Sequence, residues 1–376
     1  GYLRILTNAP AQFRTDAVAT HVDAALRVFD PDPYLAVIVL GIQREMMADD
    51  ASRIAIDEAI ARRWQRAARE RGGLAGMVHL QSAIEAASSL PALRRELLKE
   101  MRRIDPATLD LRPIETRVEL DPLVLFRERE RWLRADSITG VFDIILDGPA
   151  PSGEAERNDQ QARRLLADAG LVNATHQLVL NPEAAQPRPV NTEALRFEQQ
   201  RGVVENIHVS NWADAIAVHV LRILGVRYVP DRSELQTWIE AGDVPGDAAT
   251  MIYEAMTGWW EGAPIAGCCL MLVASIEAIA RKRLEERGGV VNDPANEKDR
   301  GGVRPLGDIL GELRDEMDES WRRFLHGTLV SDFGFNLRNR LCHGLLLRPN
   351  DDDFVVLLIG ALYLAKMGPP KPSEVI

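Results

Sequence analysis

Three side chains near the C-terminal end of the chain are of types that could bind a phosphate and move a proton. They are Arg338, Asn339 and His343, in the stretch Gly334-Phe-Asn-Leu-Arg-Asn-Arg-Leu-Cys-His-Gly344. A guanidinium stays charged and can grip two phosphate oxygens, whereas an imidazole has an ordinary pKa near neutrality. These residue types therefore suit a site that holds a phosphate and transfers a proton.

The spacing of Arg338 and His343 is weak evidence by itself, because roughly one such pair arises by chance in a chain of this composition. Its sequence context strengthens it. Leucines bracket the pattern, and we expect a short, half-buried helix over Asn336–Leu346 with Asn336 as its N-cap. On an ideal helix Arg338 and His343 lie about 140° apart. They converge only if the arginine wraps back or if a second copy contributes.

Helical periodicity dominates the chain and strand signal is scarce, which predicts an all-α protein. We expect an N-terminal helical region at 1–147, a linker and middle helical segment at 148–244, and a C-terminal helical bundle at 245–376. Short connections predict a four- to five-helix bundle in the last part. Its expected helices are Pro264–Arg287, one or two over Leu306–Leu329, the motif helix, and Phe354–Lys366.

Composition limits the classes of function. The net charge of −11 argues against broad nucleic-acid binding through the backbone, but it allows a small local basic site. Three cysteines fit a reducing, cytoplasmic setting, and no Cys/His cluster has zinc spacing, so we expect neither a metal nor a cofactor. The apolar runs Ala263–Ala280 and Phe354–Ala365 are expected to be core helices and not membrane spans.

The pattern of Arg338, Asn339 and His343 resembles the R-N-x3-H signature of the HEPN superfamily, which comprises small helical bundles, many of them ribonucleases. The resemblance extends upstream and covers about residues 245–367, where the chain looks like a bacterial HEPN-like family of unassigned function. Residues 1–240 resemble no family that we can name. The upstream stretches that carry the resemblance are Trp259-Trp-Glu-Gly262, Glu277-Ala-Ile-Ala-Arg281 and Leu306-Gly-Asp308.

The resemblance implies metal-independent RNA cleavage, in which the 2′-hydroxyl attacks the phosphate and leaves a 2′,3′-cyclic phosphate. His343 would shuttle the proton, Arg338 would hold the developing negative charge, and Asn339 would orient the phosphate or the imidazole. Because HEPN sites commonly pair two motif helices, the resemblance also implies a homodimer through the C-terminal bundle. It further implies tRNA or mRNA as substrate, and a role in phage defence or toxin-like control.

Three further residues are expected to support the site. Glu277 lies in an apolar segment and needs a partner, because an unpaired buried carboxylate is costly. That partner is either Arg281, one turn further on, or Arg338 or His343, which Glu277 would then orient. Arg340 could bind the RNA backbone, and His326 could add a phosphate contact or simply end a helix.

The alternative function is a non-catalytic HEPN-like module for dimerisation and for nucleotide or protein binding, with the motif kept for structure. On that interpretation His343 caps a helix end. Trp259 and Trp260 could stack on a base, but as helix neighbours at least one of them is expected in the core, and Cys342 is expected to be a small packing residue.

Overall fold

The computed structural model describes residues 16–104, 122–168, 178–179, 188–190, 192–228, 232–242, 244–293 and 302–367. Over these residues the chain is all-α, which confirms the predicted fold class. It divides into two compact units, an N-terminal unit of residues 1–116 with 180–189 and a C-terminal unit of residues 117–179 with 190–376. The predicted three-part division at residues 147 and 244 stays a prediction.

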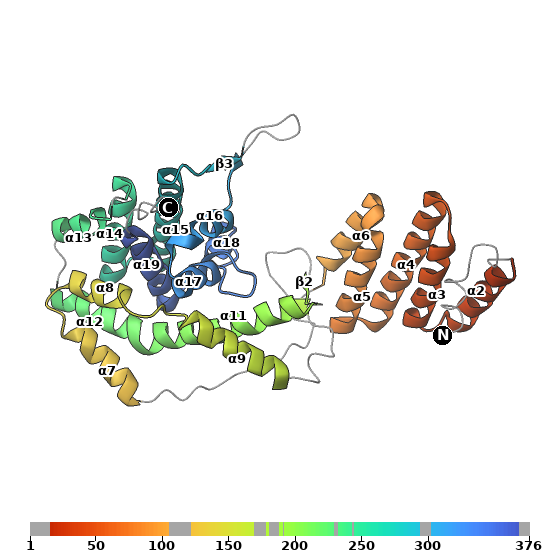
Figure 1. Ribbon diagram of the computed structural model, residues 1–376, viewed down its shortest axis with the longest axis horizontal. Coiled ribbons are helices and arrows are strands. Elements are labelled where there is room, and N and C mark those ends of the chain that lie inside the picture. The colour runs from red at the N-terminus through yellow and green to blue at the C-terminus, as the bar shows by residue number, and fades with distance from the viewer. Residues whose placement is uncertain are drawn as a thin grey trace, which may run out of the picture. The chain divides into compact units, whose positions relative to one another are not determined.

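In the N-terminal unit each described helix packs against the next one along the chain (Figure 1). Asp32 begins α3 and Asp49 begins α4, because their carboxylates accept backbone amides of the first turn. Trp64 stacks on the buried His79, with ring centroids 5.2 Å apart. The helices are α2 (Asp16–Phe29), α3 (Pro33–Met46), α4 (Asp50–Arg71), α5 (Gly73–Ala86), the 3-10 turn η2 (Ala87–Ser89) and α6 (Pro91–Met101).

The C-terminal unit is a helical assembly around one hydrophobic core that runs from Trp132 to Met367. Its first helices are α7 (Pro122–Leu133), α8 (Ile138–Leu146), α9 (Ala155–Asp168), α11 (Glu193–Trp212), the π-turn η4 (Ala213–Ala217), α12 (Val218–Tyr228) and α13 (Arg232–Glu240). The later ones are α14 (Gly246–Glu261), α15 (Ile265–Glu286), α16 (Leu306–Glu312), the 3-10 turn η5 (Leu313–Glu316), α17 (Glu319–Leu329), α18 (Leu337–Cys342) and α19 (Asp351–Lys366).

The described strands are two residues long. They are β1 (Leu178–Val179), β2 (Arg188–Pro189), β3 (Asn292–Asp293) and β4 (Gly302–Val303). In the C-terminal unit β3 pairs antiparallel with β4, with Asn292 opposite Val303. This ribbon extends the loop between α15 and α16 and adds nothing to the core, because Gly302 and Val303 are exposed.

Helix α19 lies at the centre of the C-terminal unit (Figure 1). From Phe354 to Ala365 every residue except Tyr363 is buried, and α19 packs against α8, α12, α13, α14, α15 and α17. Asn350 and Asp353 start the helix with a capping box, in which each side chain accepts the other residue's backbone amide. A helix that is apolar on all sides must be covered on all sides, so α19 determines where its neighbours lie.

Helices α11 and α12 form one continuous helix, Glu193–Tyr228, interrupted by the π-turn η4. Arg129 of α7 donates through Nε to the carbonyl of Ala215 inside that turn, at 3.1 Å. Among the described residues this is the one helix long and apolar enough to cross a membrane. Its inner face, including Val209 and Leu221, belongs to the hydrophobic core, which is the arrangement of a core helix in a soluble protein.

The loop between α17 and α18, residues 331–336, packs tightly against two helices. A Cβ atom at Gly202 of α11 would lie 2.6 Å from the carbonyl oxygen of Phe333, and one at Gly334 would overlap the carbonyl of Gly327 in α17. Asn206 of α11 also donates to the Phe333 carbonyl, at 3.0 Å. Glycines therefore allow the close approach that positions the start of α18.

We predict that Gly334→Ala lowers the free energy of unfolding by about 1–3 kcal/mol, because the new methyl group must displace the backbone at Gly327. Chemical denaturation measures the difference. Gly311→Ala in α16 is the control, since a Cβ atom there meets no atom within 4 Å. Equal stability of both variants and the wild type would contradict the tight packing of this loop.

Candidate functional site

The motif helix α18 is shorter than predicted: it spans Leu337–Cys342, not Asn336–Leu346. Gly344 adopts a left-handed conformation with φ 69°, and the amides of Leu345 and Gly344 donate back to the carbonyls of Arg340 and Leu341. This is the Schellman arrangement that ends helices at a glycine. His343 consequently lies at the C-cap of α18 and not inside it.

The other end of α18 is formed by Asn336, which is buried and left-handed, with φ 52°. Asn336 occupies the predicted N-cap position, but its side chain accepts no backbone amide of the helix. Its Oδ1 instead accepts a hydrogen bond from Nδ2 of Asn339, at 2.8 Å. The two asparagines thus tie the start of α18 to the side chain that follows Arg338.

Arg338 is held on both sides of its guanidinium. Its Nε donates to Oε1 of Glu277 in α15 at 2.7 Å, and its Nη1 donates to Oδ1 of Asn339 at 2.7 Å. No hydrogen bond from Nη2 to another described residue is present, and the side chain is 27% exposed. Nη2 is therefore available to an oxygen of a ligand.

Glu277 pairs with both of the arginines that the sequence offered as partners, Arg281 and Arg338. Burial alone would raise the pKa of the Glu277 carboxyl, but the hydrogen bonds from Arg281 and Arg338 outweigh burial and hold that pKa below its ordinary value. One carboxylate between two guanidiniums leaves the cluster with one net positive charge. The motif thus contains a local cationic site on an acidic protein.

The imidazole of His343 is exposed at the end of α18. Within the described chain no hydrogen bond or ion pair joins it to Arg338, which is turned toward Glu277. Among the described residues the arginine of the motif is thus engaged by hydrogen bonds and the imidazole is not. An ideal helix with this spacing places the two residues about 140° apart.

Three other residues singled out in the sequence, Arg340, Trp259 and Cys342, make the following contacts. Arg340 donates to the carbonyl of Phe335, at 3.3 Å. Trp259 is fully buried, stacks on Phe354 and donates to Asp351, so it anchors the core. Cys342 is exposed, and its expected role as a packing residue is wrong.

His326 lies on α17 in a polar pocket of about 290 Å³ between α11 and α17, which the loop at 331–334 closes. Partial burial and the charges of Arg322 and Arg201 lower the pKa of its imidazole, although solvent still reaches the ring. This pocket adjoins the loop into α18 and differs from the Glu277–Arg338 cluster. The sequence placed His326 near the motif but did not reveal the pocket.

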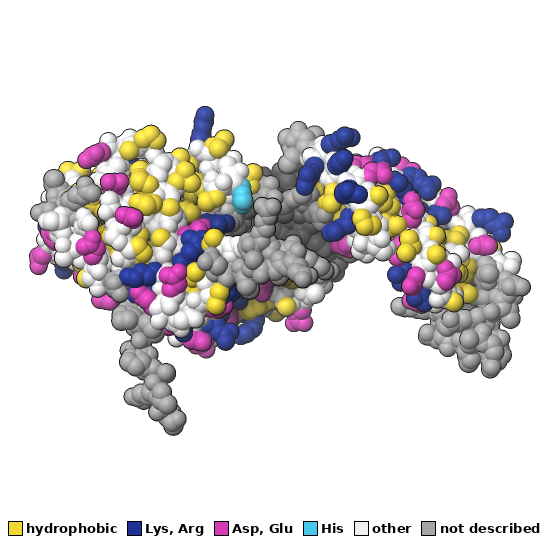
Figure 2. All heavy atoms as spheres, turned by 90° about the horizontal axis from the view of Figure 1, so that it is seen from above, with side chains coloured by type: hydrophobic (Ala, Val, Ile, Leu, Met, Phe, Trp, Pro, Cys, Tyr) yellow, Lys and Arg dark blue, Asp and Glu magenta, His cyan; other side chains and the backbone are white. Residues whose placement is uncertain are grey.

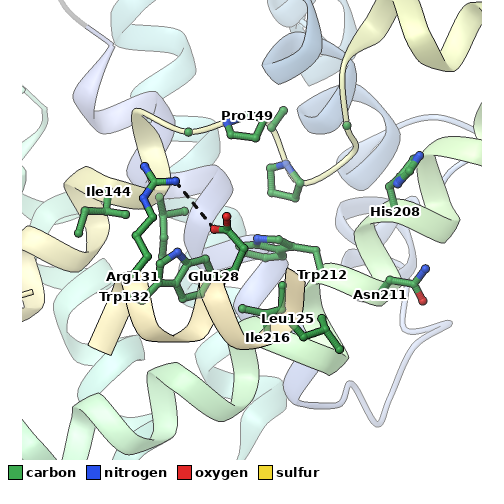
Figure 3. Close-up of a pocket in the computed structure, with 15 residues that line it drawn as sticks. Leu125, Glu128, Arg131, Trp132, Ile144, Pro149, His208, Asn211, Trp212 and Ile216 are labelled. Atoms are coloured by element: carbon green, nitrogen blue, oxygen red, sulfur yellow. Dashed lines mark ion pairs between the residues drawn. The ribbon is translucent and has the colours of Figure 1, made fainter. Parts of the chain in front are cut away.

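A second pocket, of about 370 Å³, lies between α7, the turn after α8 and the middle of the α11–α12 helix (Figure 3). The indoles of Trp132 and Trp212 form one wall, with ring centroids 6.0 Å apart. Glu128 and Arg131 form an ion pair of 3.8 Å at one side, and His208 lies on the other. The walls come from separate segments, which is why the sequence did not predict this pocket.

No family model, no curated protein and no solved structure matches the chain, so comparison with known proteins assigns it to no family. Within the described residues no group of three or more His, Cys, Asp or Glu side chains could hold a metal ion. The HEPN resemblance and the absence of a cofactor stay predictions.

Glu277→Gln tests the central ion cluster through acid stability. Since the folded-state pKa of Glu277 lies below its ordinary value of 4.5, the ion cluster stabilises the protein fully above that value. The stabilisation is lost as the pH falls through the lowered pKa. We predict that the variant loses about 1–3 kcal/mol of unfolding free energy at pH 7, and that its difference from wild type shrinks below pH ~4.

Urea denaturation at several pH values measures this effect. Glu285→Gln, an exposed position on the same helix, is the control and should show no such difference. A wild-type advantage over Glu277→Gln that persists unchanged in acid would contradict the assignment of the stabilisation to the ionised carboxylate.

Proposed function

We propose that the C-terminal unit is a metal-independent endoribonuclease of the HEPN type. The observation that carries the proposal is the Arg338 guanidinium, which Glu277 and Asn339 hold in place with Nη2 left for a ligand oxygen, beside an exposed His343. A preorganised cation and an accessible imidazole are what phosphate-ester cleavage by an internal hydroxyl needs. A cytoplasmic location and a role in phage defence or toxin-like control rest on the family resemblance.

The proposed reaction uses the RNA as its own nucleophile. His343 accepts the proton of the 2′-hydroxyl as its oxygen bonds to phosphorus, and Arg338 stabilises the charge that develops on the phosphate oxygens. The bond to the 5′-oxygen breaks, that oxygen takes up a proton from solvent, and His343 returns its own proton to solvent. The products are a 2′,3′-cyclic phosphate and a 5′-hydroxyl.

The proposed active unit is a homodimer that brings two motif helices together. Two leucines shortly after His343 support this, because Leu345 is 42% and Leu347 is 76% exposed. Leu270, which is 46% exposed, lies seven residues before Glu277 and therefore on the same face of α15. Apolar side chains next to a polar motif are suited to an interface between copies, where the His343 of one copy would act beside the Arg338 of the other.

The charge distribution supports a local contact with RNA and not a wide one. Over the C-terminal unit, on the left in Figure 2, basic side chains are interspersed with acidic and apolar ones. A net charge of −11 fits this mixed surface. The proposed substrate is accordingly a tRNA or mRNA segment that the enzyme grips at a few phosphates near the motif.

The alternative proposal is a non-catalytic module that dimerises and binds a nucleotide or a protein. One observation favours it: within a chain Arg338 is engaged by both Glu277 and Asn339. In that case the motif would act as a structural cluster that anchors α18 on α15. The two proposals differ in whether removal of His343 abolishes an activity.

We predict that the purified protein cleaves RNA in the presence of EDTA and leaves cyclic-phosphate ends. Arg338→Ala and His343→Ala should each reduce the cleavage rate by about 100-fold or more, because each removes a group that acts in the transition state. Gel analysis of tRNA and of a mixed RNA pool, with end-group analysis of the fragments, provides the measurement.

His219→Ala is the matched control, since His219 is an exposed histidine of the same unit on α12. It should cleave like the wild type. Cleavage that survives in His343→Ala would argue against the assigned role, and a folded wild-type dimer that cuts no RNA would favour the binding module.

We predict that Leu345→Glu converts the dimer to a monomer, because two charges would face each other in an apolar interface. Light scattering after gel filtration measures the mass. Val226→Glu is the control, since Val226 is 83% exposed on α12, away from the motif sequence, and should leave the dimer intact. A wild-type protein that is monomeric at all concentrations tested would contradict the proposed assembly.

A further inference from the structure

The polar pocket between α11 and α17 contains a buried acid whose hydrogen-bonding capacity is unused. Glu205 of α11 is 9% exposed and lines the pocket, and its Oε1 accepts no hydrogen bond from any described residue. The nearest cationic atoms are Nη1 of Arg323 at 3.6 Å and Nε of Arg201 at 3.9 Å, both beyond hydrogen-bond distance. A buried acceptor of this kind is costly unless a donor reaches it.

Arg201 is the complementary group, one turn before Glu205 on the same helix. Its guanidinium makes no hydrogen bond to the described residues, and its one ion pair is the 3.9 Å contact with Glu205. By contrast, Arg323 is saturated by Asp159 and Glu319. The guanidinium of Arg201 also lies over the ring of Phe197, 5.7 Å from its centroid. The pocket therefore offers, close together, a guanidinium and a carboxylate oxygen whose hydrogen bonds are unused.

The side chains of α17 extend the cationic part of the pocket. Arg322 donates to Glu319 through Nε and Nη2, at 2.7 and 2.8 Å, so its Nη1 is left over. The pKa of His326 is lowered by burial and then by Arg322 and Arg201, and the acids Glu198 and Asp332 do not reverse this. The side chains of Arg201 and Arg322 therefore line the pocket together with the imidazole, an arrangement that suits an anion.

Together, Arg201, Arg322 and His326 face the pocket from two helices and can share the three oxygens of a phosphate monoester. A hydroxyl of the sugar that carries the phosphate would lie within reach of Glu205, because Arg201 and Glu205 are neighbours. From these contacts we infer that the pocket is a binding site for a phosphate monoester that carries neighbouring hydroxyl groups, as a sugar phosphate or a ribonucleotide does.

The pocket also touches the loop that positions the motif. Phe333 and Gly334 line it, and the next residues lead to Asn336, whose side chain holds Asn339. A ligand in the pocket would contact this loop directly. The inference stands without the proposed ribonuclease activity, because it concerns binding at a separate site.

Isothermal titration calorimetry with ribose 5-phosphate tests the inference. Ribose and inorganic phosphate, the two parts of that ligand, are titrated separately for comparison. We expect ribose 5-phosphate to bind best, inorganic phosphate more weakly, and ribose not measurably. Arg201→Gln should weaken the binding of both phosphates about tenfold or more, because it removes a charge-assisted hydrogen bond. Glu205→Leu should weaken ribose 5-phosphate alone, since inorganic phosphate has no sugar hydroxyl to donate.

Arg314→Gln is the control, because Arg314 is an exposed arginine of η5 that pairs only with its neighbour Asp315. Circular dichroism verifies that the variants are folded, and Arg201→Gln leaves Glu205 near Arg323. No binding of either phosphate at millimolar concentration, or binding that Arg201→Gln does not change, would overturn the inference. Ribose that binds as well as its phosphate would overturn it too.

A further titration, of a short RNA oligonucleotide into His343→Ala protein, distinguishes an RNA strand from a free small molecule as the ligand. A 5′-phosphorylated oligonucleotide that competes with ribose 5-phosphate and loses affinity in the Arg201→Gln background supports the site and assigns it to the terminal phosphate of an RNA strand. Binding of ribose 5-phosphate without such competition supports the site as one for a free small molecule. Because both readouts are binding, they remain informative even if the protein cleaves no RNA.

Discussion

The complete burial of α19 is the constraint on which the C-terminal unit depends. An apolar helix has no face that it can turn to water, so six other helices must cover it, and the polar capping box at Asn350 and Asp353 marks where burial stops. One of these covering helices is α15, which buries residues such as Leu272 and Ile276. The face of α15 that remains carries Glu277 and Arg281, and α18 packs beside it. The position of the motif thus follows from how the helices pack around α19.

The pairing of half-buried charged side chains is the second factor that organises the C-terminal unit, because each such charge needs an opposite charge or a dipole nearby. Arg283, which is almost fully buried, donates to the backbone carbonyls of Gly242 and Ala365. Glu277 pairs with both Arg281 and Arg338, and this pairing holds Arg338 against α15. The pairing is looser at Glu205, whose Oε1 lies 3.6 Å from Arg323 and 3.9 Å from Arg201 and accepts no hydrogen bond from the described residues. Hydrogen-bonded ion pairs therefore characterise the motif, and a carboxylate oxygen without a hydrogen-bond donor characterises the polar pocket.

Periodicity predicted the long helices well, because α15 and α19 are apolar over many turns: the predicted Phe354–Lys366 and the observed Asp351–Lys366 differ only in the capping turn. The motif helix was predicted too long. Gly344 directly after His343 was the signal for its end, since glycine stops helices in the left-handed conformation. The left-handed Asn336 and the choice of Glu277 for Arg338 depend on contacts between α15 and α18, which spacing along the chain cannot reveal. The two pockets were missed for the same reason.

The proposed sharing of each site between two copies rests on the spacing of Arg338 and His343, about 140° apart on an ideal helix, and on the exposed Leu345 and Leu347. Mixing Arg338→Ala and His343→Ala proteins, after exchange of subunits, tests it most directly. In a mixed dimer one of the two sites would contain an intact arginine from one copy and an intact histidine from the other. Random exchange should therefore restore RNA cleavage to about a quarter of the wild-type rate. A mixture as inactive as its separate components, with subunit exchange verified, would contradict the shared site.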